Sequence, residues 1–395
     1  MTSENILTEI KENNKKTDIT SIYKIMIIYD LGILYIGDSC LQLSRLKKIK
    51  SYYNNASIDI NTEDTKNHSI LNAILQNNPY INSYSNLAWD NIEFKKYDLV
   101  ICTCIPERKF LEFLLSKYGN DFSAKTMKIA IYSGFTSFTN ETTLGFDEKT
   151  YGIPVFPINK TFNKYQLLPD EEKSMLANEL FISKKEITWG NNWLMENGLM
   201  ADENLIILID TSSQNEKLLN INVYFELLSW FFTFKKSKVL IFDEKGIGKK
   251  SFYKSWLGNN QMSKLIFAEN LPLRKALCLI SSNFTRLIFG PSTGLLHCAS
   301  GIFNVLNENT PMMIAYTGKV DNKYVEKLWW NKSIVDGIIL TKNESNQKTI
   351  KSIKNSDFIN IKNIDLIDIC ENYTTLDIQK YILNNYSKGI SSLIS

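Results

Sequence analysis

One corner of the sequence combines small hydroxyl residues, a glycine and a histidine in a spacing that suits anion binding. The segment FGPSTGLLHCAS follows the apolar run RLIF, and its Gly-Pro pair would end that strand. Ser292 or Thr293 can cap a helix that begins near Gly294, and the free N–H groups of its first turn would attract an anion. His297 follows Thr293 by one helical turn on the same face. The alternative is a capped strand-to-helix turn in which a neighbouring group satisfies the hydrogen bonding of His297.

A second corner carries two hydroxyl groups and a lysine. The strand-like run NLIILID ends near Asp210, and Ser212, Ser213 and Lys217 follow it. Short hydroxyl side chains can donate hydrogen bonds to phosphate oxygens, while the lysine supplies a point charge. The pattern therefore suits a phosphate or diphosphate group. An ordinary polar loop before a helix would have the same composition, so this alternative stays open.

A third corner, GILYIGDSC, offers a carboxylate. Asp38 follows Gly37 at the end of the first strand-to-helix connection. In that place it could act as a general base toward a hydroxyl group. The competing interpretation is structural, because Asp38 or Ser39 is a good N-cap and Ser39-x-x-Gln42 has the spacing of a capping box.

Other motifs give no support for a phosphate loop or for metal chemistry. The segment GIGKKS follows a strand, but a P-loop needs a glycine where Asp243 stands and a hydroxyl residue where Lys250 stands. No D-x-D motif occurs, and with 6 cysteines but only 2 histidines a Cys/His zinc site is not expected. We expect reduced, mostly buried cysteines and neither a metal nor a cofactor.

The elements that would place these corners alternate between strands and helices. Short runs rich in isoleucine, valine and leucine predict buried parallel strands, and apolar residues at spacing three or four predict helices. Strands are predicted at 23–30, 57–60, 98–105, 127–135, 204–210, 238–242, 264–269, 286–290, 311–318 and 336–341. Helices are predicted at 40–53, 68–76, 110–119, 170–185, 221–234, 273–282, from 294 onward and at 376–387.

This alternation predicts an α/β chain of two doubly wound, Rossmann-like domains facing across a cleft. Ligands would bind there, beyond the carboxyl ends of the parallel strands. The expected organisation is a polar leader at 1–20, an N-terminal domain at 21–165, a linker helix region at 166–200, a C-terminal domain at 201–375 and a last helix at 376–395.

Composition and charge limit the choice of partners. The chain has 45 basic and 42 acidic residues, and a net charge of +3 does not indicate a nucleic acid partner. No apolar run approaches the roughly 20 residues that span a bilayer, and the first residues do not resemble a signal peptide, so we expect a cytoplasmic protein. The aromatic run YFELLSWFFTF at 224–234 predicts a buried helix. Its alternative is a helix that touches the inner face of a membrane, as in peripheral association.

Together the three corners resemble the lipopolysaccharide heptosyltransferase-like glycosyltransferases, glycosyltransferase family 9, whose fold is GT-B. The most specific likeness is the family's GP(S/D)TG–LH signature, and the similarity runs from about residue 23 to 320. The matching stretches, in the family's order, are Gly37-Asp38, Asn78 to Ile81 with Tyr97 to Ile101, Ser212-Ser213 with Lys217, and Gly290 to His297.

The resemblance implies an inverting, metal-independent transfer of a heptose-like sugar from a nucleotide-diphosphate sugar, ADP-heptose in the family. The acceptor would be a hydroxyl group of a glycan, a protein or a small metabolite. Asp38, in the acceptor-side domain, would be the catalytic base. The donor site, in the nucleotide-sugar-binding domain 201–375, would consist of Ser212, Ser213, Lys217, Ser292, Thr293, Gly294 and His297.

Two alternatives belong to other functional classes. One is a non-catalytic GT-B-like binding subunit of a glycosylation system. The other is a different GT-B chemistry, such as epimerisation or phosphorolysis. The sequence leaves the oligomeric state open.

Overall fold

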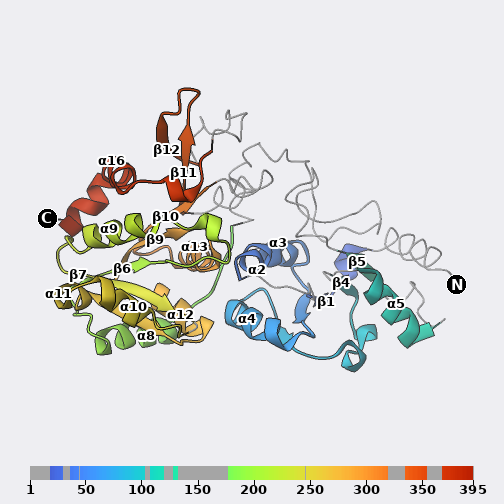
Figure 1. The fold of residues 1–395 in the computed structure, drawn as a ribbon. Helices are drawn as coiled ribbons and strands as arrows, with labels where there is room; N and C mark the ends of the chain where they lie inside the picture. Colours follow the sequence, from blue (N-terminus) through green and yellow to red (C-terminus); the bar gives the residue numbers. More distant parts are fainter. Residues whose placement is uncertain are drawn as a thin grey trace. The chain divides into compact units, whose positions relative to one another are not determined.

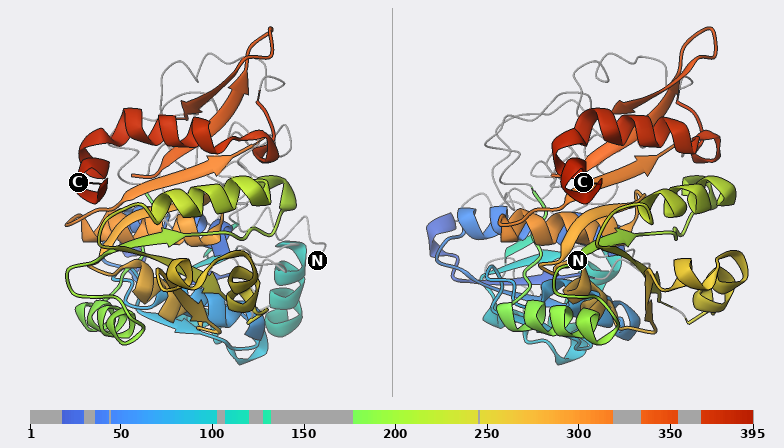
Figure 2. Two further views of the ribbon diagram at one scale, coloured as in Figure 1. Left: turned by 60° about the vertical axis from the view of Figure 1, so that its left-hand side comes forward. Right: turned by 90° about the vertical axis from the view of Figure 1, so that its left-hand side faces the viewer.

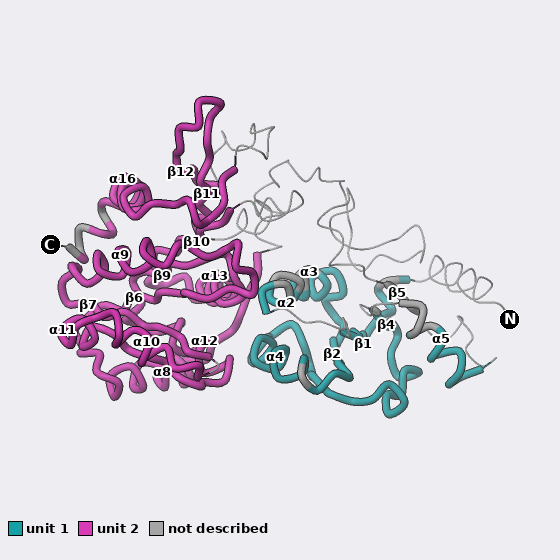
Figure 3. The backbone as a smooth tube through the Cα atoms, in the orientation of Figure 1, with its two compact units in different colours: residues 1–176 teal, residues 177–395 magenta. Residues whose placement is uncertain are grey.

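The chain divides into two compact units, residues 1–176 and 177–395, each with its own sheet (Figure 3). The structure is a computed structural model. It describes residues 18–29, 36–43, 45–102, 107–119, 128–131, 177–244, 246–318, 334–353 and 367–394. The expected leader before residue 18, the expected loop at 136–163 and the segment 170–176 lie outside the described residues.

The first unit contains a parallel five-stranded sheet with the order β3-β2-β1-β4-β5 (Figure 1). Its strands are β1 (Lys24–Ile28), β2 (Ser57–Asn61), β3 (Ser83–Ser85), β4 (Leu99–Cys102) and β5 (Lys128–Ile131). The four apolar strands confirm the sequence prediction. Strand β3 was not predicted, because its three residues, SYS, are too short and polar to show a pattern.

Helices join these strands in the expected alternation. They are α2 (Ile36–Leu43), α3 (Arg45–Tyr52), α4 (Thr65–Leu75) and α5 (Glu107–Tyr118), with short 3-10 turns at Ile19–Ser21, Trp89–Asn91 and Phe94–Lys96. Leu46 and Ile49 are buried, as the spacing of three between them predicted. Parallel strands with intervening helices confirm the doubly wound class for this unit.

The second unit contains a seven-stranded sheet with the order β12-β11-β10-β9-β6-β7-β8. Its strands are β6 (Asn204–Leu208), β7 (Ser237–Asp243), β8 (Leu265–Glu269), β9 (Thr285–Pro291), β10 (Met312–Thr317), β11 (Asp336–Lys342) and β12 (Lys348–Ser352). All pairs are parallel except β11 with β12. Strand β12, KTIKS, escaped prediction because it is a lysine-rich edge strand without a buried run.

Two layers of helices cover this sheet (Figure 1, Figure 2). The helices are α8 (Lys184–Glu196), α9 (Ile221–Phe231), α10 (Lys249–Trp256), α11 (Asn259–Met262), α12 (Leu273–Ile280), α13 (Gly294–Leu306) and α16 (Thr375–Ile394), with 3-10 turns at Asn215–Lys217 and Cys370–Asn372. Side chains of α9, α10 and α16 share one core with one face of the strands. Helix α12 packs against α8 and α13. The strand order reverses between β6 and β9, which makes their carboxyl ends the topological switch point.

The helix predicted at 170–185 is wrong for its described part, because residues 177–183 are not helical and α8 begins at Lys184. A capping box sets this start: Ser183 Oγ accepts from the Glu186 N–H, and the Glu186 carboxylate accepts from the Ser183 N–H. Arg274 also holds the Glu186 carboxylate, at 2.7 Å. The amphipathic spacing of the sequence therefore placed the start of the helix too early.

The aromatic run at 224–234 spans most of α9, which ends at Phe231, and the turn after it, with Tyr224, Phe225 and Phe231 in the core. Of the two sequence interpretations, the structure supports the buried helix. No helix among the described residues combines the length and the apolar character needed to cross a membrane. Four cysteines of the described part are free and buried, as expected: Cys40, Cys278, Cys298 and Cys370.

Candidate active site

The start of α13 lies where the sequence predicted it, at the end of β9. Thr293 is the N-cap residue by backbone position, but its side chain makes no capping hydrogen bond. The hydroxyl oxygens of Ser292 and Thr293 are both buried without a hydrogen-bond partner among the described residues. The expectation that one of them caps the helix is therefore wrong. Two buried hydroxyls and the free N–H groups of the first turn, beginning at Gly294, remain to bind a ligand.

Lys217 joins the second predicted corner to the first. It ends the 3-10 turn after β6, and its Nζ donates a hydrogen bond to the backbone oxygen of Ser292 at 3.3 Å. A positive charge therefore stands beside the positive end of the α13 dipole. Such an arrangement favours a bound anion, because both positive groups lie within reach of one ligand.

Ser212 and Ser213 lie on the loop that leads to Lys217. The Oγ of Ser212 accepts a hydrogen bond from the Gln214 N–H at 3.2 Å, which shapes the loop, and Ser213 is exposed. The hydrogen bonds described for these two serines do not reach α13. The structure thus brings Lys217, Ser292, Thr293 and His297 together and leaves Ser212 and Ser213 on the adjoining loop.

His297 is buried in the first turn of α13 and is 3% exposed. Burial, and to a smaller degree the positive charge of Lys217, lowers the pKa of its imidazole from 6.5 to about 3. The side chain is therefore neutral at physiological pH. Its backbone oxygen accepts a hydrogen bond from Asn178 Nδ2 at 2.6 Å, so the residue is held through its main chain as well.

Asp38 lies near the start of α2 in the first unit. Its side chain is outside the described part of the structure, so its role as a base stays a prediction. Among the described residues, no group of three or more His, Cys, Asp and Glu side chains could hold a metal ion.

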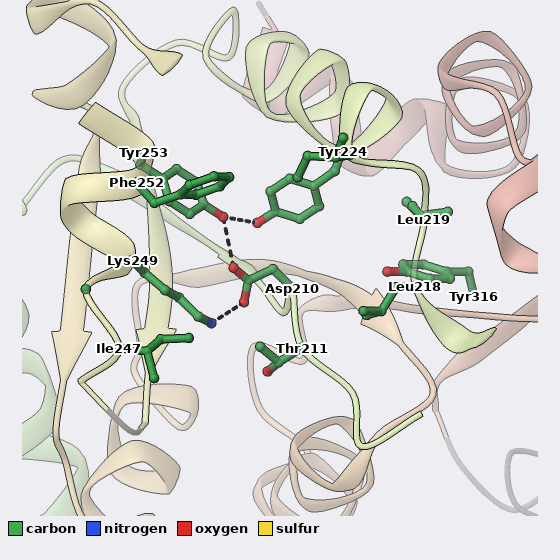
Figure 4. A pocket seen from close by; sticks show the side chains of 12 residues that line it. Asp210, Thr211, Leu218, Leu219, Tyr224, Ile247, Lys249, Phe252, Tyr253 and Tyr316 are labelled. Carbon is green, nitrogen blue, oxygen red and sulfur yellow. Dashed lines mark hydrogen bonds and ion pairs between the residues drawn. The ribbon is translucent and has the colours of Figure 1, made fainter. Parts of the chain in front are cut away.

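A pocket of about 390 Å³ opens beside the Lys217 loop, on the face of the sheet covered by α9 and α10 (Figure 4). A buried ion pair joins Lys249 Nζ to Asp210 Oδ1 at 2.6 Å. Tyr253 donates to the other oxygen of Asp210 at 3.0 Å, and its hydroxyl lies 2.6 Å from that of Tyr224. Burial and the Asp210 carboxylate raise the pKa of both phenols. The two tyrosines therefore stay protonated and serve as hydrogen-bond donors.

Sequence reasoning missed this network. The only sequence feature near it is the segment Gly246 to Lys249, which follows a strand but does not match a P-loop. The structure agrees with this mismatch: the Asp243 carboxylate accepts from the N–H groups of Ile247, Gly248 and Lys249 at 3.0, 3.1 and 3.0 Å. Those N–H groups are consequently engaged and do not form a phosphate cradle. Gly248 adopts φ +87°, a conformation that explains the second glycine.

Comparison with solved structures relates this fold to known proteins. The chain is similar to the Escherichia coli ADP-heptose lipopolysaccharide heptosyltransferase II, with a TM-score of 0.53 and 16% identity over 81% of this chain and 92% of that one. It is also similar to a family 9 glycosyltransferase of Veillonella parvula, with a TM-score of 0.54 and 12% identity over 81% of this chain and 86% of that one. The chain thus has the fold of these glycosyltransferases, which confirms the predicted GT-B class.

No family model matches the chain, and a search of curated proteins also gives no match.

The buried imidazole predicts a defined pH dependence of stability. Between pH 6.5 and about 3, His297 is protonated in the unfolded chain but stays neutral in the folded chain. Because the unfolded chain binds more protons, the free energy of unfolding falls as the pH decreases. The stability that the neutral His297 imidazole contributes to the folded chain is fully present above pH 6.5. We expect His297→Gln to flatten the slope in this window by up to about 1.4 kcal/mol per pH unit.

Urea unfolding followed by circular dichroism at a series of pH values measures the slope. The same change at His68, the only other histidine, controls for the loss of an imidazole in general. An identical slope in His297→Gln and the native chain would contradict this account.

Proposed function

We propose that the chain is an inverting glycosyltransferase that moves a heptose-like sugar from a nucleotide-diphosphate sugar, ADP-heptose by resemblance, to a hydroxyl acceptor. The observation that carries the proposal is the contact of Lys217 with the Ser292 backbone at the start of α13. It unites a lysine, two unpartnered buried hydroxyls and a helix N-terminus in one place. The shared fold supports the proposal, since one of the solved structures is an ADP-heptose heptosyltransferase.

The chemistry follows from the charge that develops during transfer. As the bond between the anomeric carbon and the diphosphate breaks, negative charge grows on the leaving oxygens. The Lys217 ammonium and the N–H groups at Gly294 and Leu295 would stabilise that charge, and the hydroxyls of Ser292 and Thr293 would donate further hydrogen bonds. These groups take the part that a metal ion plays in other nucleotide-sugar transferases, so the proposed reaction is metal-independent.

On the acceptor side the proposed base is Asp38. The acceptor oxygen attacks the anomeric carbon on the face opposite the diphosphate, and its proton passes to the Asp38 carboxylate. One new C–O bond replaces the bond to the diphosphate, and the configuration inverts. The proposed acceptor is a hydroxyl group of a glycan, a protein or a small metabolite.

The proposed diphosphate site makes a prediction for Lys217. We expect Lys217→Ala to weaken ADP binding by roughly 10- to 100-fold, the value of one hydrogen bond to a charged group, and to change AMP binding much less. Isothermal titration with both nucleotides measures the difference. Lys184→Ala, an exposed lysine on α8, is the matched control. If Lys217→Ala keeps the native preference for ADP over AMP, the lysine does not hold the second phosphate.

The proposed base makes a separate prediction. Asp38→Asn should lower the transfer rate by about 10²- to 10⁴-fold, the usual contribution of general base catalysis, while ADP affinity stays near the native value. Asp90→Asn, at an exposed aspartate of the same unit, is the control. Product formation is assayed with a panel of nucleotide sugars and candidate acceptors.

Near-native turnover of Asp38→Asn would show that the base lies elsewhere. A native chain that binds ADP but neither transfers nor hydrolyses any sugar of the panel would instead be a non-catalytic binding subunit.

A further inference from the structure

Helix α10, the turn before it and the start of α9 carry exposed apolar side chains that the proposed reaction does not use. Ile247, Phe252 and Trp256 are 71%, 45% and 54% exposed, and Ile221 at the start of α9 is 45% exposed. Three of them, Ile221, Ile247 and Phe252, line the pocket beside the Lys217 loop. We call these four residues the α10 patch, and we propose that it docks on the surface of an anionic membrane.

The patch is held rigidly from below. The Trp256 ring stacks on Phe225 at 5.0 Å, and the Phe252 ring lies 6.1 Å from the same ring. Phe225 itself belongs to the core of the second unit. The exposed aromatic rings therefore have fixed positions, so little conformational entropy is lost when another surface covers them.

Ile247 is presented outward by an equally well-defined turn. Its N–H and the next two N–H groups are bound by the Asp243 carboxylate, as described above. The turn thus holds an isoleucine in water although its backbone is fixed. Such an exposed isoleucine gains free energy when it enters an apolar phase.

Charge indicates which partner fits. Helix α10 has the sequence KKSFYKSW, without an acidic residue, and its Lys250 and Lys254 are exposed between the aromatic side chains. Its third lysine, Lys249, forms an ion pair with Asp210. Tryptophan and phenylalanine interleaved with lysine match the headgroup region of a bilayer, where the rings enter the interface and the ammonium groups meet lipid phosphates.

The proposal is independent of the proposed reaction, because it needs neither donor nor acceptor. Its test is sedimentation of the full chain with vesicles of phosphatidylglycerol and phosphatidylcholine, and with vesicles of phosphatidylcholine alone. We expect binding to the anionic vesicles that weakens with added salt. Lys250→Gln with Lys254→Gln should lower the partition coefficient roughly 30-fold, at about 1 kcal/mol for each lysine, and Ile247→Asn should lower it roughly tenfold.

Matched controls separate this patch from other surfaces. Lys184→Gln with Lys185→Gln removes two exposed lysines from α8, and Met200→Asn removes an apolar side chain that is 62% exposed; both should bind as the native chain does. Brominated lipids should quench native tryptophan fluorescence more than that of Trp256→Phe, which keeps an aromatic ring on Phe225.

Three results would overturn the proposal. The native chain could fail to bind anionic vesicles at low salt. Its binding could be lost in the control variants and kept in the α10 variants. Finally, the native chain could sediment as a dimer that Ile247→Asn dissociates, without vesicle binding, in which case a second copy covers the patch.

Discussion

The close approach of β6 and β9 at their carboxyl ends is the constraint on which the candidate site depends. A side chain at Gly290 would meet the Ile209 side chain at 2.6 Å and its backbone oxygen at 2.8 Å, so only glycine lets the two strand ends run this close together. Consequently the loop after β6 and the helix after β9 begin side by side. Lys217 can then reach the Ser292 backbone, although 75 residues separate them.

A second set of contacts fixes α13 from its other side. The Nδ2 of Asn178 donates to the His297 backbone oxygen, and its Oδ1 accepts from Ser300 and Asn304 at 3.1 and 3.2 Å. Asn178 is 3% exposed, so these bonds form where an unpaired amide would cost free energy. The helix that presents the proposed anion site is thus held before a ligand arrives, which lowers the cost of binding.

Sequence reasoning succeeded where one local pattern determines the structure. Runs such as NLIILID and KVLIF predicted buried parallel strands, and Gly-Pro followed by Ser-Thr-Gly marks the end of β9 and the start of α13. The hydroxyl caps were predicted wrongly, because composition cannot tell a hydroxyl that caps its own helix from one that makes no capping hydrogen bond. The helix start was also predicted wrongly, because the apolar spacing of residues 177–183 fits a helix although the Ser183 capping box starts α8 at Lys184.

The Asp210 network shows the remaining limit. Asp210 follows β6, whereas Lys249 and Tyr253 both belong to α10, and no local pattern pairs residue 210 with residues 249 and 253. Only the sheet order, with β7 beside β6, brings α10 to the end of β6. Polar contacts across elements follow from topology, and topology is the part of a fold that single-sequence patterns specify least.

The most direct test of the central claim is a crystal structure of the chain with ADP. The account predicts that the second phosphate lies against the N–H groups at the start of α13, within hydrogen-bonding distance of Lys217 Nζ and of the hydroxyls of Ser292 and Thr293. A complex in which ADP binds elsewhere, for example in the pocket above Asp210, with Lys217 still on the Ser292 backbone, would contradict it.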